Sequence, residues 1–263
     1  MKYFAVIGDP VSHSISPILH NMAIFELGLD AVYTRYHLKK SSEIINAFIS
    51  LGLSGANVTI PHKEFALALC DEASSMAKNI GSANTLVFKN NKIYAYNTDG
   101  LGFLKSISDF SEIKSALVIG AGGTAKAIAY ILKQNFIDVE ILNRSLDRLE
   151  GFKQAYECYT WNDFLPKNYD LVINTTSASL RDDLLPAPIE ILTPIISSSR
   201  YAFDVIYGKT TPFLHLAIQN NLVCKDGLDM LLHQAVLAFN LFFDNDLDEY
   251  EIQKAMQKAL RLL

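Results

Sequence analysis

The sequence predicts an α/β protein with two domains, each built on a largely parallel sheet. Short apolar segments of strand-like composition alternate with longer segments of helical period, first over residues 3–73 and again from Ser115. In the second series an apolar strand runs directly into a glycine-rich turn and an apolar helix, which marks the start of a new domain near Leu101 to Ile113. A length of 263 residues suits two domains of medium size.

The first series alternates strands and helices in chain order. Strands are expected at 3–8, 31–38 and 55–60, and helices at 16–28, 42–52 and 62–73. Ser16 is a suitable N-cap for the first of these helices, Pro17 suits its first turn, and Gly28 is expected to end it.

Two extended runs between Asn84 and Asp99 are joined by Asn90-Asn91, a pair that favours a type I′ turn. They predict an antiparallel hairpin at an edge of the first sheet. In its register Asn84 pairs with Asn97, so Asn84 and Asp99 become diagonal neighbours on one face. The alternative is plain turn chemistry, because Asn, Asp and Gly all favour loops.

The second series has strands at 116–120, 139–144, 169–176 and 201–207. A long buried helix is expected over 228–243. A terminal amphipathic helix follows, in which acids lead, bases trail and apolar residues share one stripe: Ile252, Met256, Ala259 and Leu263.

The composition narrows the class of protein. Half of the residues are hydrophobic and 19% are charged, which predicts a globular chain, and no apolar run reaches the roughly 20 residues of a membrane span. The amino terminus lacks a signal-peptide pattern and the three cysteines form no CxxC pair, so we expect a cytoplasmic protein without disulfides or zinc. A net charge of -5 without a basic run favours a small-molecule partner and disfavours nucleic acid.

A glycine-rich turn follows the strand at 116–120. Gly120, Gly122 and Ala125 form the pattern GxGxxA, in which the glycines permit a tight turn and close approach of the backbone to a pyrophosphate. The following helix start favours an anion. We therefore predict a Rossmann-type dinucleotide site, the alternative being a turn retained for packing.

The next strand ends in Asn143-Arg144, where an NAD-binding unit usually offers an acid to the ribose. Arg144, with Arg148 one turn later, suits a 2′-phosphate through charge-assisted hydrogen bonds. The sequence therefore favours NADP over NAD. The alternative is that both arginines only face solvent at the start of a helix.

Hydroxyl groups stand close together at the start of the first helix. Ser14 and Ser16 lie beside backbone N–H groups and make a plausible carboxylate seat, although capping alone would account for Ser16. No role is assigned to His13.

Lys63 is expected in the first turn of a helix that follows Pro61. A cation is unfavourable there by about 0.3 to 1 kcal/mol, which suits an acid–base group better than a structural one. The alternative is a solvated surface lysine. In the strand before it, Asn57 and Thr59 point to the face opposite Val58.

Eight blocks of sequence resemble the shikimate dehydrogenase family in order and spacing along nearly the whole chain. They are SHSISP (12–17), GANVTIPHK (55–63), GSANTL (81–86), NTDG (97–100), GAGGTAKA (120–127), NR (143–144), INTTS (173–177) and DGLDMLLHQA (226–235).

The resemblance implies NADP-linked, reversible reduction of 3-dehydroshikimate to shikimate, without a metal. It implies a substrate domain over 1–103 and 238–263, a Rossmann-type NADP domain over 104–237, and a C-terminal helix that returns to the first domain. Lys63 and Asp99 would form the catalytic pair. The carried-over substrate contacts are Ser14, Ser16, Asn57, Thr59, Asn84, Tyr207 and Gln234, together with the catalytic pair. The carried-over cofactor contacts are Gly120, Ala121, Gly122, Gly123, Thr124, Asn143, Arg144, Arg148, Thr175, Val205 and Gly227.

Three positions depart from the family pattern. Ser179 stands where glycine is more common, the stretch from Tyr207 to Phe213 is a residue short, and His62 replaces an aromatic residue that either touches ligand or packs. A relative that also accepts quinate or NAD is the alternative enzyme, and a catalytically silent NADP-binding regulator is the alternative outside enzymes. The resemblance allows a monomer or a homodimer.

Overall fold

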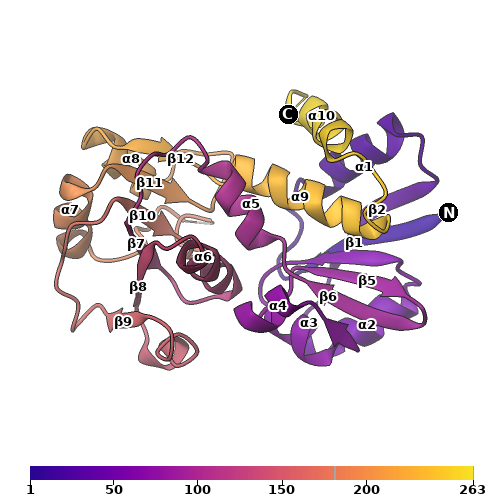
Figure 1. Cartoon of the computed structure of the whole chain (residues 1–263), viewed down its shortest axis with the longest axis horizontal. Helices are drawn as coiled ribbons and strands as arrows, with labels where there is room; N and C mark the ends of the chain where they lie inside the picture. Colours follow the sequence, from indigo (N-terminus) through magenta and orange to yellow (C-terminus); the bar gives the residue numbers. More distant parts are fainter. Residues whose placement is uncertain (181, 263) are drawn as a thin grey trace. The chain divides into compact units, whose positions relative to one another are not determined.

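The computed structural model describes residues 1–180 and 182–262. The chain divides into two compact units, Met1–Gly102 with Leu231–Leu263, and Phe103–Met230. Each unit contains one six-stranded sheet (Figure 1). No helix in the described ranges is long and apolar enough to cross a membrane.

The sheet of the first unit has the order β2-β1-β3-β5-β6-β4. β1 is parallel to β2 and β3, β5 is antiparallel to β3 and β6, and β4 is parallel to β6. The strands are β1 (Lys2–Gly8), β2 (Ala31–His37), β3 (Gly55–Val58), β4 (Glu72–Ala73), β5 (Thr85–Lys89) and β6 (Lys92–Tyr96).

Asn90 and Asn91 both have positive φ, and Lys89 pairs with Lys92, so the predicted hairpin turn is confirmed. The prediction that this hairpin forms the sheet edge is wrong, because the two-residue strand β4 pairs outside β6. The second arm also ends earlier than predicted: β6 stops at Tyr96 and Asp99 begins a helix. The Asn97 side-chain oxygen accepts a hydrogen bond from the backbone N–H of Asp99, and this turn directs the chain away from the β5–β6 hairpin.

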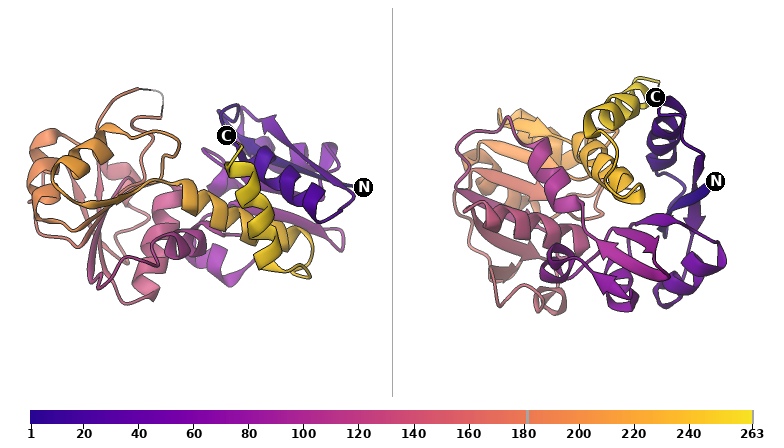
Figure 2. Two further views of the ribbon diagram at one scale, coloured as in Figure 1. Left: turned by 90° about the horizontal axis from the view of Figure 1, so that it is seen from above. Right: turned by 45° about the vertical axis from the view of Figure 1, so that its right-hand side comes forward.

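Helices cover both faces of this sheet. One face packs against α1, α10 and the part of α9 that belongs to the first unit, through Phe4, Leu19, Phe239 and Met256 among others. α1 and α10 lie side by side (Figure 2), so the implied return of the C-terminal helix is confirmed. The opposite face packs against α2 and α3. The helices are α1 (Ser16–Glu26), η1 (Ser41–Glu43), α2 (Ile44–Ser50), α3 (Lys63–Leu69), α4 (Ser75–Ile80), α9 (Leu228–Phe242) and α10 (Glu249–Leu260).

The ends of α1 show one correct and one wrong prediction. Gly28 has a φ of 62° and follows the helix end, as expected. Ser16 is not the N-cap: the helix begins at Ser16 and its N-cap is Ile15. The Ser16 hydroxyl instead lies against that of Ser14, at 3.1 Å. The terminal helix buries Ile252, Met256 and Ala259 as predicted, while Leu263 lies outside the described residues.

The second unit has a parallel sheet in the order β12-β11-β10-β7-β8-β9, with adjacent strands all parallel, which confirms the Rossmann-type prediction. α6 contacts β7 and β8, and α8 contacts β11 and β12. Its elements are α5 (Asp99–Ser106, shared with the first unit), β7 (Ser115–Ile119), α6 (Gly123–Gln134), β8 (Asp138–Asn143), η2 (Leu146–Leu149), β9 (Glu157–Thr160), β10 (Leu171–Asn174), α7 (Ile189–Ser198), β11 (Tyr201–Asp204), α8 (Pro212–Gln219) and β12 (Val223–Lys225).

Candidate active site

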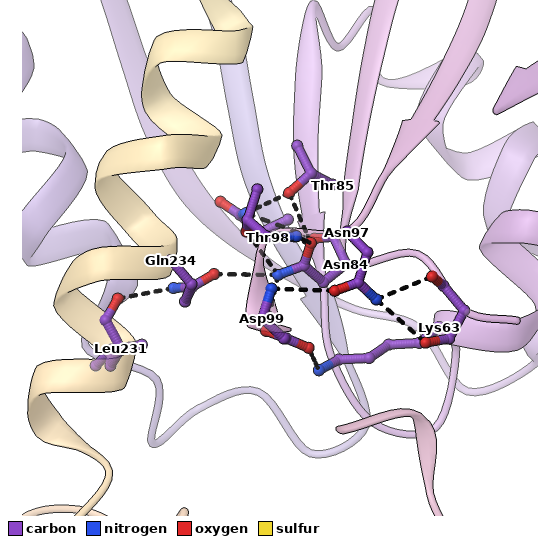
Figure 3. A network of polar contacts seen from close by, with 10 residues as sticks. Lys63, Asn84, Thr85, Asn97, Thr98, Asp99, Leu231 and Gln234 are labelled. Atoms are coloured by element: carbon purple, nitrogen blue, oxygen red, sulfur yellow. Dashed lines mark hydrogen bonds and ion pairs between the residues drawn. The ribbon is translucent and has the colours of Figure 1, made fainter. Parts of the chain in front are cut away.

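A buried ion pair joins the starts of two helices in the first unit. Lys63, the first residue of α3, places its Nζ 2.5 Å from Oδ2 of Asp99, the first residue of α5 (Figure 3). The side chains are only 11% and 7% exposed. A surface lysine would be solvated, so burial beside a carboxylate removes that alternative for Lys63.

The second oxygen of Asp99 is also engaged. Asn84 Nδ2 donates to Asp99 Oδ1 at 2.8 Å and lies 3.3 Å from Oε1 of Gln234 on α9. The predicted convergence of Asn84 and Asp99 is therefore present. Asn97, which the hairpin register placed beside them, instead donates to the backbone of Ser82.

The turn that carries Lys63 is anchored by the residue before it. His62 is fully buried; its Nε2 lies 2.8 Å from the Leu38 carbonyl and its Nδ1 lies 2.6 Å from Ser41 Oγ. Because a carbonyl only accepts, Nε2 carries the proton and Nδ1 accepts from the serine. Burial lowers the pKa of His62, against the opposing effect of the Leu38 hydrogen bond. His62 therefore packs and anchors the start of α3, which decides the question that the sequence left open.

Polar groups on β3 and β5 continue the cluster. Asn57 is buried on β3, where Tyr33 donates its hydroxyl to Asn57 Oδ1 at 2.7 Å. Thr85, opposite Asn57 on β5, lies 3.3 Å from Asn57 Nδ2 and donates to Asn84 Oδ1 at 3.0 Å. Thr59 follows β3 directly, and its backbone N–H donates to Ile7.

The two N-terminal serines form a small hydroxyl pair. Ser14 and Ser16 are both buried, and the Ser16 backbone N–H donates to Ser14 Oγ at 3.3 Å. Arg35 donates two hydrogen bonds to the Ser14 carbonyl, at 2.7 and 2.9 Å. This fixes the turn that presents the hydroxyls.

In the second unit, the turn between β7 and α6 contains two glycines, Gly120 and Gly122, whose surroundings differ. Gly120 has a φ of 114°, and a Cβ there would lie 2.5 Å from Thr175 Oγ1, so packing alone requires glycine. At Gly122 a Cβ would meet no described heavy atom within 4 Å. Packing does not explain Gly122, whereas open space at the N-terminus of α6 fits a pyrophosphate. Ala121 belongs to this turn, and Gly123 and Thr124 are the first two residues of α6.

β8 ends at Asn143 and is followed directly by Arg144, with no acid at either position, while Asp147 and Arg148 follow in the short helix η2. Arg144 and Arg148 are exposed, and the Asn143 side chain donates to the Ser145 carbonyl at 2.9 Å. Arg144 lies two residues before the four-residue 3-10 helix η2 and Arg148 lies within it, so both arginines face solvent at the start of a short helix. This donor set fits the 2′-phosphate of NADP.

The remaining cofactor candidates, Thr175, Val205 and Gly227, follow the ends of β10, β11 and β12. Thr175 donates to the Ile119 carbonyl at 2.8 Å. Gly227 packs so tightly on Val205 that a Cβ would lie 2.1 Å from its carbonyl oxygen. Tyr207 is half-buried in the loop after β11. Ser179 has a φ of 70°, the backbone form that explains why glycine suits this position.

Several residues of these networks were not singled out from the sequence. Thr85 and Thr98 both bind Asn84, and the only sequence signal was their adjacency to Asn84 and Asp99. Asp204 is buried at the end of β11, where Thr211, Asn174 and the backbone of Ile206 donate to it, and burial raises its pKa. An acid that ends the apolar run YAFD was the available signal. In the described part of the chain, no cluster of histidine, cysteine and acidic residues suits a metal ion.

Comparisons with known proteins agree with each other. Residues 6–86 match the family model described as shikimate dehydrogenase substrate binding domain. The chain is 49% identical over 245 residues to a shikimate dehydrogenase (NADP(+)) of Helicobacter hepaticus, covering 92% of this chain and 91% of that protein.

Solved structures show the same similarity. A shikimate 5-dehydrogenase of Thermus thermophilus in complex with NADP(H) and shikimate is 30% identical, with a TM-score of 0.84 and coverage of 98% of this chain and 100% of that one. A shikimate dehydrogenase of Aquifex aeolicus is 32% identical, with a TM-score of 0.83 and coverage of 97% of both chains.

Proposed function

The chain belongs to the shikimate dehydrogenase family, and we propose from this premise that it catalyses the reversible, NADPH-dependent reduction of 3-dehydroshikimate to shikimate. It is an oxidoreductase that acts on a CH–OH group. The observation that carries the proposal is the buried Lys63–Asp99 pair, whose two charges lie 2.5 Å apart beside the Asn84 amide.

Lys63 serves as the acid and base of this reaction. Bound NADPH supplies the hydride that reduces the ring carbonyl carbon. As negative charge grows on the carbonyl oxygen, the Lys63 ammonium donates a proton to it and the hydroxyl forms. In the oxidation of shikimate, neutral Lys63 takes the hydroxyl proton. Asp99 orients Lys63 through the ion pair, and Asn84 in turn fixes Asp99.

The substrate contacts follow from the polar groups of the first unit. The ring hydroxyls of the substrate can form hydrogen bonds with three side-chain amides and one hydroxyl. These belong to Asn57, Asn84 and Gln234, and to Thr59. Ser14 and Ser16, whose turn is held by Arg35, suit its carboxylate.

The second unit holds NADP. The open space at Gly122 and the start of α6 receive the pyrophosphate, and Arg144 and Arg148 pair with the 2′-phosphate. Asn143, Thr175, Val205 and Gly227 are the further cofactor contacts on the ends of the strands. Ala121 contributes from the turn, and Gly123 and Thr124 contribute from the first turn of α6.

Initial rates of shikimate oxidation by NADP+, followed by the absorbance of the reduced nicotinamide, test this proposal. In Lys63→Ala, kcat falls at least about a hundredfold and the KM for shikimate changes little, because an acid–base group acts mainly on the chemical step. Lys89→Ala is the matched control, since Lys89 also pairs with an aspartate at 2.5 Å but is 53% exposed.

The control variant should keep wild-type turnover. Near-normal turnover of Lys63→Ala would remove Lys63 from the acid–base role, and inactive wild-type protein would overturn the activity itself.

A further inference from the structure

A buried tyrosine contacts Asn57, one of the proposed substrate-binding residues of the first unit. Tyr33, on β2, is 2% exposed and donates its hydroxyl to Asn57 Oδ1 at 2.7 Å. On β1, which lies between β2 and β3, Tyr33 pairs with Phe4 and Asn57 pairs with Val6. The hydrogen bond between Tyr33 and Asn57 therefore crosses β1 diagonally on one face of the sheet. Burial raises the pKa of Tyr33 well above its usual range, so its hydroxyl keeps its proton and remains a donor.

The ring of Tyr33 is held in place by a second buried ring. His20 of α1 stacks on it with centroids 4.1 Å apart and planes 8° apart. Neither ring nitrogen of His20 has a hydrogen-bond partner among the described residues, and burial lowers the pKa of His20 to about 3. His20 is therefore a neutral stacking partner. It holds the tyrosine ring in the position in which the hydroxyl reaches Asn57.

The acceptors on the other side of Asn57 show which way its side-chain amide points. Asn57 Nδ2 lies 3.5 Å from the Asn84 carbonyl and 3.3 Å from Thr85 Oγ1. The carbonyl only accepts, and the Thr85 hydroxyl already gives its hydrogen to Asn84 Oδ1. The NH2 group of Asn57 must therefore face β5, and its oxygen must face Tyr33.

We infer that Tyr33 is a positioning residue for substrate binding: its hydroxyl fixes the orientation of the Asn57 amide, whose NH2 group is thereby kept on the side of Asn84, the neighbouring substrate-binding amide. This inference rests on the proposed function, in which Asn57 contacts the substrate. Without the tyrosine hydroxyl, the buried Asn57 oxygen loses its donor, and the amide gains by turning toward other partners. The long contacts of Nδ2 oppose that rotation only weakly.

Steady-state kinetics of Tyr33→Phe test the inference. The KM for shikimate rises about tenfold, since one hydrogen bond is misdirected, while kcat and the KM for NADP+ stay within about twofold of wild type. Tyr36→Phe is the matched control because it removes a hydroxyl from the same strand, on the face that packs against α2. It should behave as wild type.

A double-mutant cycle separates positioning from a general structural role. In an Asn57→Ala background, Tyr33→Phe should raise the KM for shikimate no further. An unchanged KM in the single variant, or an equal rise in the Asn57→Ala background, overturns the inference.

A second measurement does not depend on turnover. The side-chain amide signals of Asn57 in NMR, assigned by their loss in Asn57→Ala, should shift in Tyr33→Phe and stay in place in Tyr36→Phe. If the wild type fails to oxidise shikimate, the proposed function falls alone, and unshifted Asn57 signals would still overturn the role of Tyr33.

Discussion

At the scale of single residues, two hydrogen bonds fix Asp99, the ion-pair partner of Lys63. One carboxylate oxygen accepts from Lys63 and the other from the Asn84 amide, so the carboxylate is fixed from both sides. Asn84 is itself oriented by the backbone N–H of Thr98, at 2.8 Å. Lys63 Nζ is thereby held in one place, which is the preorganisation that the proposed proton transfer needs.

The sequence predicted part of this arrangement. The Asn90-Asn91 turn fixes the hairpin register as far as Thr85 and Tyr96, and the turn at Asn97 then brings Asp99 to Asn84. The diagonal contact between Tyr33 and Asn57 was beyond the sequence, because it depends on the order of three strands that are distant along the chain. The wrong N-cap at Ser16 has a local cause: its hydroxyl pairs with that of Ser14 rather than with the helix.

His20 gives a residue-scale prediction for pH. Its pKa is about 3 in the folded chain, because of burial, and near 6.5 in the unfolded chain. As the pH falls below 6.5 the unfolded chain binds the proton first, so stability falls progressively until about pH 3. Between pH 7 and pH 5 the loss from this group is about 2 kcal/mol.

Urea unfolding of the wild type and of His20→Phe at both pH values measures this contribution. The variant keeps a ring against Tyr33 but does not titrate, so its loss of unfolding free energy between the two pH values should be smaller by that amount. Equal losses in the two proteins would show that His20 binds a proton in the folded state.

At the scale of elements, the sequence predicted correctly those elements that have a strong local pattern and missed those that have a weak one. The glycine-rich turn and the terminal amphipathic helix lie where the sequence placed them. The expected helix over 62–73 instead ends at Leu69, and the chain forms β4 at Glu72–Ala73. A strand of two residues has no periodicity to detect, and only its pairing with β6 defines it.

The turn between β7 and α6 carries an element-scale prediction. Gly122→Ala should change the free energy of unfolding by less than about 1 kcal/mol, because no described atom lies within 4 Å of the new Cβ. Its affinity for NADPH, measured by fluorescence titration, should fall about tenfold or more, because the methyl group occupies the approach of the pyrophosphate.

Gly120→Ala provides the contrast. Its φ of 114° and the 2.5 Å approach to Thr175 Oγ1 predict a loss of stability before any effect on the cofactor. Unchanged NADPH affinity in Gly122→Ala would contradict the assignment of this turn to the pyrophosphate.

At the scale of the whole molecule, the chain divides its chemistry between two units. The proposed acid–base pair and the proposed hydroxyl-binding amides belong to the unit Met1–Gly102 with Leu231–Leu263, and the glycine-rich turn and the two arginines belong to Phe103–Met230. Periodicity alone predicted two α/β domains, and the assignment of substrate and cofactor to them comes from the resemblance. The choice between shikimate and quinate depends on side-chain positions that no local pattern encodes.

The most direct test of the account compares initial rates for shikimate and quinate, each with NADP+ and with NAD+. We expect the highest kcat/KM for shikimate with NADP+, because Arg144 and Arg148 stand where an NAD-binding unit has an acid. A preference for quinate or for NAD+, or the absence of any reduced nicotinamide with shikimate and NADP+, would contradict it.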